Sequence, residues 1–140
     1  MHKVISSSHA PSFPTILSQA RRVGNLLFTC GTVPMRPGTK ELAAADIEGQ
    51  TRVSLENLGH ILRAGGADFA TCVKVTVYLT DMRDYSAMNA IYKQFFKQPM
   101  PARTCVGVKE LALPGMRVEI EAVAEIPSLD GAGTVPTMNP

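Results

Sequence analysis

Residues 72–80 read Cys-Val-Lys-Val-Thr-Val-Tyr-Leu-Thr, and this stretch decides the fold. Side chains alternate between the two faces of a strand, so one face of this segment carries Val73, Val75, Val77 and Leu79. The other face carries Lys74, Thr76, Tyr78 and Thr80. A strand with one apolar face packs that face against helices or a second sheet. The pattern therefore predicts a strand of a sheet that is covered on one side.

Both segments that flank this strand predict helices. Residues 46–64 place apolar side chains at helical spacing, with Asp46 in the first turn or as the cap and Gly65-Gly66 at the end. Residues 84–97 show a second amphipathic stripe. Core packing is the expected role of nearly all residues in that stripe, which are Tyr85, Met88, Ile91, Tyr92, Phe95 and Phe96.

Further strands are predicted at residues 25–30, 102–108 and 116–124, the last two joined through Leu113-Pro114-Gly115. The first 35 residues consist of strands and turns. The element order is therefore β-β-α-β-α-β-β, an α+β mixed sheet with two helices on one face. Residues 1–127 are expected to form a single domain. Residues 128–140 are rich in Gly, Pro, Thr and Asn and predict a flexible C-terminal tail.

Composition excludes several classes of protein. The 140 residues carry a net charge of +2 and scattered cations, which argues against a nucleic-acid-binding surface. No apolar run approaches the ~20 residues of a membrane span. The three cysteines form neither a metal pattern nor a disulfide framework and indicate a reducing compartment. We expect a cytoplasmic protein; the absence of Asp and Glu from residues 1–40 leaves a mitochondrial presequence as the alternative.

Three charged residues on the last two strands carry the functional prediction. Arg103 shares one face of its strand with Cys105, whereas Glu119 and Glu121 share one face of theirs. We expect all four on the uncovered face of the sheet. A guanidinium grips a carboxylate in two places, and a nearby glutamate transfers protons. The alternatives are an ion pair between Arg103 and a glutamate, and an inter-subunit salt bridge for Glu121; two close carboxylates would raise one pKa.

The segments around these residues resemble the RidA/YjgF family, the L-PSP enamine/imine deaminases. The most specific part is Pro-Ala-Arg-Thr-Cys-Val at 101–106 with Val-Glu-Ile-Glu-Ala at 118–122, and the likeness covers about residues 3–126. Three further stretches agree: 24–34, Gln50 to Asn57, and 84–96. The resemblance implies a chorismate-mutase-like fold and a homotrimer, in which three sheets form a barrel-like core with clefts between subunits.

The resemblance also implies an activity: hydrolysis of 2-enamino and 2-imino acids, such as 2-aminoacrylate and 2-iminopropanoate, to 2-oxo acids and ammonia. No metal or organic cofactor is implied. Such a hydrolase of carbon–nitrogen bonds removes reactive intermediates left by pyridoxal-phosphate enzymes. By the resemblance Arg103 binds the substrate carboxylate and Glu119 positions or activates water. The other implied pocket residues are Gly31, whose backbone approaches the ligand, Cys105 and Asn89.

Two positions depart from the family pattern. Leu17 stands where many of the deaminases have tyrosine, and Cys30 stands where serine is common. We expect both to line the pocket, with Leu17 favouring a more apolar substrate side chain. The departures support one alternative function, a non-catalytic binding or chaperone-like protein. A ribonuclease-type translation inhibitor is the other alternative, although the charge and the spacing of His2, His9 and His60 give it little support.

Overall fold

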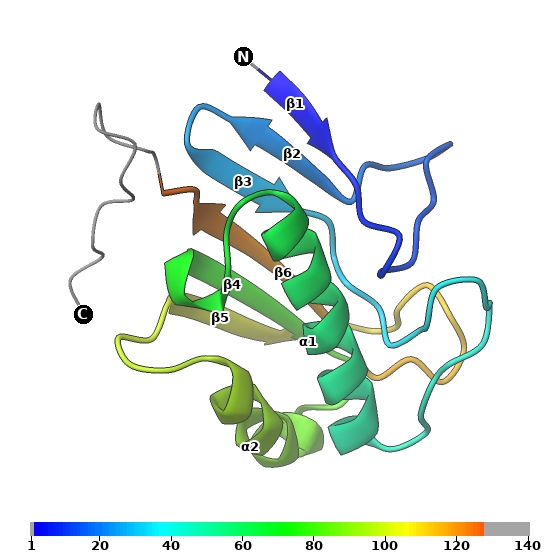
Figure 1. The fold of residues 1–140 in the computed structure, drawn as a ribbon. Helices are drawn as coiled ribbons and strands as arrows, with labels where there is room; N and C mark the ends of the chain where they lie inside the picture. The colour runs from blue at the N-terminus through cyan, green and yellow to red at the C-terminus, as the bar shows by residue number, and fades with distance from the viewer. Residues whose placement is uncertain (1, 128–140) are drawn as a thin grey trace.

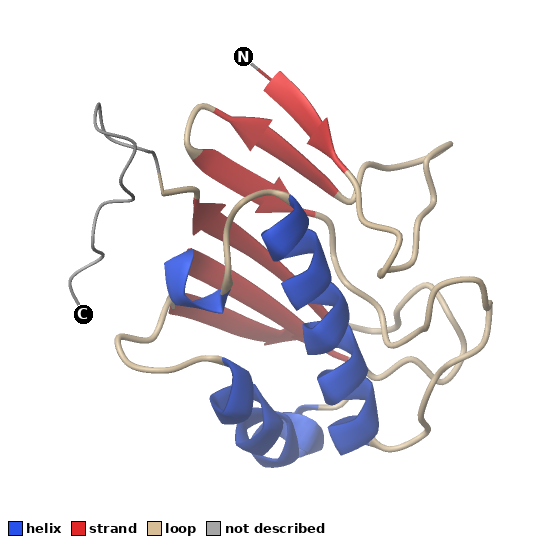
Figure 2. Ribbon diagram, in the orientation of Figure 1, coloured by secondary structure: helices blue, strands red, loops and turns tan. Residues whose placement is uncertain are grey.

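The computed structural model describes residues 2–127, and in them six strands form one mixed sheet (Figures 1 and 2). The spatial order is β1-β2-β3-β6-β4-β5. Helices α1 and α2 cover one face of the sheet (Figure 1). In chain order the elements are β1 (His2–Ile5), β2 (Ala20–Val23), β3 (Leu26–Thr29), α1 (Ile47–Ala64), β4 (Cys72–Leu79), α2 (Tyr85–Phe95), β5 (Ala102–Gly107) and β6 (Val118–Glu125), with single 3-10 turns at Phe69–Thr71 and Met82–Asp84.

The alternating 72–80 pattern corresponds to β4, an interior strand of the sheet. Strand β4 pairs antiparallel with β6 and parallel with β5, which lies at the edge. A parallel pair needs a crossover, and α2 provides it between β4 and β5. Val75, Val77 and Leu79 are fully buried, as the pattern requires. Val73 is 48% exposed because a bulge between Cys72 and Lys74 shifts the register there.

Three strands precede α1, where the sequence predicts two. Strands β1, β2 and β3 each have four residues and pair antiparallel in succession. Strand β2 contains Arg21-Arg22 and has no apolar alternation, so its pattern predicts no strand on its own. The remaining elements follow the predicted order, and the α+β class with two helices on one face is confirmed.

Both helices lie within one or two residues of their predicted bounds. Asp46 caps α1 by accepting a hydrogen bond from Gly49 N at 3.2 Å. Gly65 caps its C-terminus, and Gly66 follows at φ +85°, a conformation that favours glycine. The six residues that form the predicted stripe of the first helix are all buried: Ile47, Thr51, Leu55, Leu58, Ile61 and Leu62. From the second stripe Met88, Ile91 and Tyr92 of α2 are buried, together with Phe96 at its C-cap.

The register of β5 corrects one prediction. Arg103 lies opposite Val75 and Cys105 opposite Val77, and residues paired in this way share a face. Arg103 and Cys105 therefore lie on the helix-covered face, at the edge of the sheet. Glu119 lies opposite Tyr78 and Glu121 opposite Thr76, on the uncovered face. The sequence predicts all four residues on the uncovered face. This prediction is confirmed for Glu119 and Glu121 and is wrong for Arg103 and Cys105.

No helix within residues 2–127 is long and apolar enough to cross a bilayer. The predicted tail at 128–140 lies outside the described residues.

Candidate functional site

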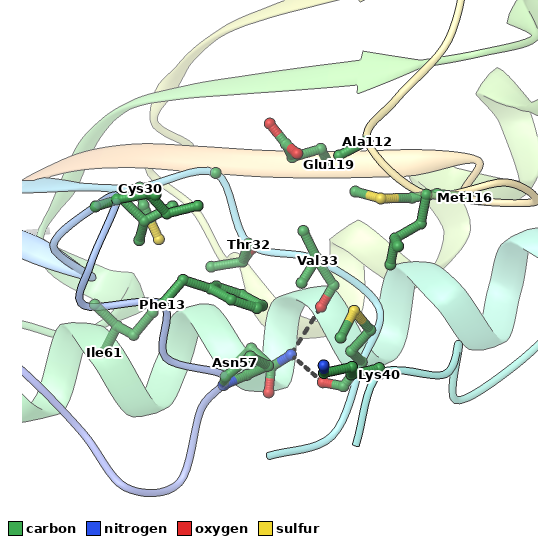
Figure 3. Close-up of a pocket in the computed structure, with 16 residues that line it drawn as sticks. Phe13, Cys30, Thr32, Val33, Lys40, Asn57, Ile61, Ala112, Met116 and Glu119 are labelled. Atoms are coloured by element: carbon green, nitrogen blue, oxygen red, sulfur yellow. Dashed lines mark hydrogen bonds between the residues drawn. The ribbon is translucent and has the colours of Figure 1, made fainter. Parts of the chain in front are cut away.

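Three loops gather at one end of the sheet, where β3 ends (Figure 1), and residues from all three line a cleft. They are residues 6–19, 30–46 and 108–117. The cleft has a volume of about 410 Å³, within the range of small-molecule sites, about 300–1,000 Å³. Figure 3 shows Glu119 from β6 on one side of it and Asn57 from α1 on the other. Four predicted site residues line this cleft: Leu17, Cys30, Gly31 and Glu119.

A bulge brings the backbone of Gly31 against the Glu119 carboxylate. Phe28 pairs with Val123 and Thr32 bridges Ile120, so three residues of one segment face two residues of β6. Such an extra residue re-aims the chain, often beside active sites. A Cβ at position 31 would overlap with Glu119 Oε2. The missing Cβ permits this approach while the Glu119 side chain keeps its position, so position 31 lies against the Glu119 carboxylate.

The environment of Glu119 raises its pKa above the ordinary value. Burial is the main cause, and the neighbouring charge of Glu121 adds to it. Glu121 in turn accepts a hydrogen bond from the Tyr78 hydroxyl. That bond, with burial, raises the pKa of Tyr78 to about 12, so this hydroxyl stays protonated. The charge of one carboxylate therefore raises the pKa of the other, as predicted. A raised pKa makes the Glu119 carboxylate a stronger base than an ordinary glutamate.

Cys30 and Leu17 give the cleft an apolar wall next to Glu119. Burial and the charge of Glu119 raise the pKa of the Cys30 thiol to about 11, so it remains a neutral thiol at physiological pH. Leu17 is 39% exposed and lies in the loop between β1 and β2. The side chain of Gln19 holds that loop by accepting from Ser7 N and donating to the carbonyls of Ser7, Ala10 and Pro11.

Arg103 lies in a second cleft, between β5 and α2. Its guanidinium donates to Asn89 Oδ1 at 2.7 Å and to the Tyr85 hydroxyl at 3.1 Å. Its central carbon lies 4.7 Å from the centre of the Tyr92 ring, which is cation–π distance. All of these partners are neutral. Within residues 2–127 of one copy no carboxylate forms a salt bridge with Arg103, so the alternative of an inter-strand ion pair with Glu119 or Glu121 does not occur inside a single chain.

The cleft at Arg103 is suited to an anion. Its volume is about 330 Å³, and its lining contains two cations and no acidic side chain: Asn89, Tyr92, Lys93, Met100, Pro101 and Arg103. Burial raises the pKa of Tyr92 to about 12, so its phenol does not neutralise the arginine. Cys105 lines neither cleft; it is half-buried behind Arg103, and burial raises the pKa of its thiol.

One copy of the chain does not bring Arg103 and Glu119 together. Strand β4 lies between their strands, and their partners on β4, Val75 and Tyr78, are three residues apart. The two Cα atoms are therefore about 10 Å apart across the sheet and about 10 Å apart along it, and their side chains leave opposite faces. The predicted pocket is divided between two clefts of one chain.

Three residues contact groups of the two clefts although the sequence predicts no functional role for them: Tyr85, Tyr92 and Asn57. Tyr85 and Tyr92 were predicted as core, yet both contact the guanidinium of Arg103. Tyr85 lies four residues before Asn89 and Tyr92 lies three residues after it, so all three share one helix face. This spacing could have predicted that both tyrosines lie next to a site that contains Asn89. Asn57 donates to the carbonyls of Val33 and Met35. Asn57 is a polar residue within the apolar face of a predicted helix, a position that indicates a buried hydrogen-bonding role.

The histidines also show a contact that their spacing does not predict. The rings of His9 and His60 lie 5.3 Å apart between centroids. Within the described residues no three His, Cys, Asp or Glu side chains form a group that holds a metal ion.

Comparison with known proteins identifies the family. Residues 7–126 match the model of the family described as endoribonuclease L-PSP. A RutC family protein of Pyrococcus horikoshii is 43% identical over 89% of this chain and 98% of its own length. The human 2-iminobutanoate/2-iminopropanoate deaminase is 41% identical over 89% of this chain and 90% of its own. The crystal structure of a conserved Rid family protein from Yersinia pestis matches 90% of this chain and 100% of its own, with a TM-score of 0.85 and 36% identity. The chain belongs to the L-PSP family, the family of the Rid and RutC proteins.

Proposed function

We propose that this protein is a 2-iminobutanoate/2-iminopropanoate deaminase, which hydrolyses 2-imino and 2-enamino acids to 2-oxo acids and ammonia. The observation that carries the proposal is the state of Arg103: a guanidinium oriented by neutral side chains, in a cleft with no acidic lining. A relative of 41% identity has the name of this activity. All three cysteines are free thiols, which is consistent with work in a reducing compartment, and we place the protein in the cytosol.

Arg103 binds the substrate through its carboxylate. Asn89 and Tyr85 each hold one terminal nitrogen of the guanidinium, and the remaining donors are available for two parallel hydrogen bonds to an anion. Tyr92 supports the guanidinium plane from its ring face. A positively charged fork that is already oriented loses little freedom on binding, so the anchor fixes the 2-imino carbon at a defined distance.

Glu119 transfers the protons. An enamine substrate first takes a proton on its β carbon and loses one from nitrogen, which gives the imine. The Glu119 carboxylate then removes a proton from water while the water oxygen bonds to the imine carbon, and this proton passes to the nitrogen of the resulting carbinolamine. Glu119 moves a second proton from the carbinolamine hydroxyl to nitrogen, the carbon–nitrogen bond breaks as the carbonyl forms, and ammonia leaves with a 2-oxo acid. The raised pKa of Glu119 favours each proton transfer. Imines already hydrolyse in water, so a stabilisation of a few kcal/mol is sufficient.

The complete site forms between copies of the chain. Arg103 and Glu119 leave opposite faces of one sheet, so a site with both needs Arg103 from one copy and Glu119 from the next. The uncovered face of the sheet carries the exposed apolar residues Phe28 and Val106, which a second copy would bury. We propose a homotrimer with three such sites, because a closed ring repeats one interface.

A second function, ligand binding without turnover, has one specific observation in its favour. The wall beside Glu119 has a neutral thiol at Cys30 and a leucine at Leu17, and neither positions water well. Within residues 2–127 the Glu119 carboxylate accepts no hydrogen bond, whereas the Glu121 carboxylate accepts one from Tyr78. The ribonuclease alternative has the family description in its favour, but the net charge of +2 gives an RNA backbone few partners.

The test is release of ammonia and pyruvate from 2-aminoacrylate generated in situ by a serine dehydratase, with wild type and Arg103→Ala side by side. Acceleration by the wild type alone supports the deaminase and its carboxylate anchor. No acceleration by either protein contradicts the proposal. Binding of pyruvate without acceleration identifies the binding protein, and cleavage of RNA that is insensitive to Arg103→Ala identifies the ribonuclease.

A further inference from the structure

Two histidines from different parts of the fold lie against each other at the surface. His9 belongs to the loop between β1 and β2, residues 6–19, and His60 lies near the C-terminal end of α1 (Figure 1). The centroids of their rings are 5.3 Å apart, and the ring planes are tilted by 32°. His9 is exposed and His60 is partly exposed, so solvent and small ions reach both rings. Neither side chain belongs to the proposed deaminase site.

The separation of the two rings is the one that a tetrahedral metal ion requires. Zn²⁺ binds an imidazole nitrogen at about 2.0–2.1 Å, and this nitrogen lies about 1.2 Å from the centroid of its ring, so the ion lies about 3.2 Å from each centroid. Two such ligands at the tetrahedral angle of about 109° place the centroids about 5.2 Å apart. A right angle, as in a square-planar Cu²⁺ site, would place them about 4.5 Å apart. The observed separation of 5.3 Å matches the tetrahedral arrangement.

Both histidines are held in place by the structure around them. His60 is fixed by its helix. On the loop, the residues on either side of His9 are fixed by the side-chain amide of Gln19. This amide donates to the carbonyl of Ser7 at 3.0 Å and to that of Ala10 at 3.1 Å, and Ala10 is buried. Ligands that already lie at the required separation lose little freedom when they bind a metal ion.

The charges around the pair are balanced, which permits a cation to bind there. Two cations act on His60, Arg63 and Arg36, and each contacts a carboxylate. Arg63 lies 3.4 Å from Asp68, and Arg36 lies 3.6 Å from Glu56, which is one helical turn before His60. Burial, followed by the charge of Arg63, lowers the pKa of the His60 imidazole. This ring is therefore neutral at physiological pH, and the neutral form is the one that binds metals.

We propose that His9 and His60 bind one Zn²⁺ ion per chain. Within residues 2–127 no group of three His, Cys, Asp or Glu side chains could hold a metal ion, so the protein supplies two ligands and water completes the tetrahedron. The bound ion links loop 6–19 to α1. The same loop contributes Phe13 and Leu17 to the wall of the cleft, so zinc binding restrains one wall of that cleft.

Calorimetric titration of the full chain with zinc chloride tests the site. The wild type is expected to bind one ion per chain. The second imidazole binds within the same molecule as the first, which increases affinity by roughly 100-fold, so His9→Ala and His60→Ala should each weaken zinc binding by about that factor. His2→Ala is the matched control and should keep the wild-type affinity, since His2 is the remaining histidine and lies in β1, outside the pair.

Three results of this titration would overturn the proposal. They are no binding of zinc by the wild type, wild-type affinity in His9→Ala or His60→Ala, and loss of binding in His2→Ala, which would place the ion in β1. An increase in molecular mass on addition of zinc, measured by light scattering, would also overturn it, because the two histidines would then come from different molecules.

Unfolding by urea controls for folding and gives a second measurement of the site. Without zinc, all three variants should unfold like the wild type, because the substituted side chains lie at the surface. With zinc, the midpoint should move to higher urea in the wild type and in His2→Ala only, since an ion that binds the folded chain stabilises it. Equal shifts in the wild type and in His60→Ala would contradict the site. His9→Asn and His60→Gln replace an alanine variant that does not fold.

Discussion

At the scale of single residues, the Arg103 guanidinium makes the sharpest prediction. Lysine keeps the charge but has no planar fork and does not make the two contacts to Asn89 and Tyr85. Loss of one hydrogen bond to a charged group corresponds to about 10- to 100-fold in kcat/KM. The kcat/KM of Arg103→Lys should therefore be about 10- to 100-fold below that of the wild type, whereas its free energy of unfolding, measured with urea, should be unchanged. Wild-type kcat/KM in Arg103→Lys would show that charge alone binds the substrate.

The pKa of Glu119 predicts the pH profile. Glu119 acts as a base, so activity falls as pH decreases through its pKa, and that pKa is raised. The acid limb of the kcat/KM profile should consequently lie above the ordinary glutamate value of about 4.3. Glu121→Gln removes the like charge that contributes to the shift, after burial, so it should move the limb to lower pH. An acid limb at the same pH in the wild type and in Glu121→Gln would show that Glu121 does not shift the pKa of the catalytic base.

Gly31 predicts a steric coupling with Glu119. In Gly31→Ala the new Cβ overlaps with the carboxylate, so the variant should lose activity and about 1–3 kcal/mol of stability. Glu119→Ala removes the obstructing group. In that background Gly31→Ala should cost much less free energy of unfolding, a difference that a double-mutant cycle measures. Equal costs in the two backgrounds would mean that the loop, not the carboxylate, determines the need for glycine.

At the scale of the elements, α1 determines the shape of the cleft through one buried amide. Asn57 is 2% exposed and holds the segment after Gly31 by two carbonyl contacts. Asn57→Ala leaves the Met35 carbonyl without this partner and the Val33 carbonyl with only its bond from Met35 N, which costs about 1–3 kcal/mol. Ser54→Ala is the matched control on the same helix, because the buried Ser54 Oγ has no hydrogen-bond partner within residues 2–127. Urea unfolding should show a loss in Asn57→Ala and little or none in Ser54→Ala.

Elements also show how far the sequence predicts this molecule. The 72–80 alternation and the helical stripes predict β4, α1 and α2 because each has one strongly apolar face. The sequence also predicts which residues of each late strand share a face: Arg103 with Cys105, and Glu119 with Glu121. The apolar alternation of β6 places the glutamates on the uncovered face, as the structure confirms. The face of Arg103 and Cys105 depends on the register of β5 against β4 and was not predictable, because edge strand β5 has no apolar alternation of its own. The polar contacts of Tyr85 are likewise tertiary, and its helical spacing resembles core packing.

At the scale of the whole molecule, the positions of Arg103 and Glu119 on opposite faces predict complementation between inactive variants. Arg103→Ala and Glu119→Gln each remove one half of every site if the halves come from different copies. When the two variants are unfolded together, mixed in equal amounts and refolded, some sites combine an intact Arg103 with an intact Glu119.

For a ring in which each site takes one residue from each of two neighbours, about a quarter of the sites are intact after random mixing. The refolded mixture should recover up to about a quarter of wild-type activity, whereas each variant refolded alone should recover none. The double variant Arg103→Ala/Glu119→Gln, mixed with wild type, controls for refolding yield. If the site lay within one copy, no intact site would form in the mixture. Activity that stays at the level of the single variants would therefore show that Arg103 and Glu119 do not act together across an interface.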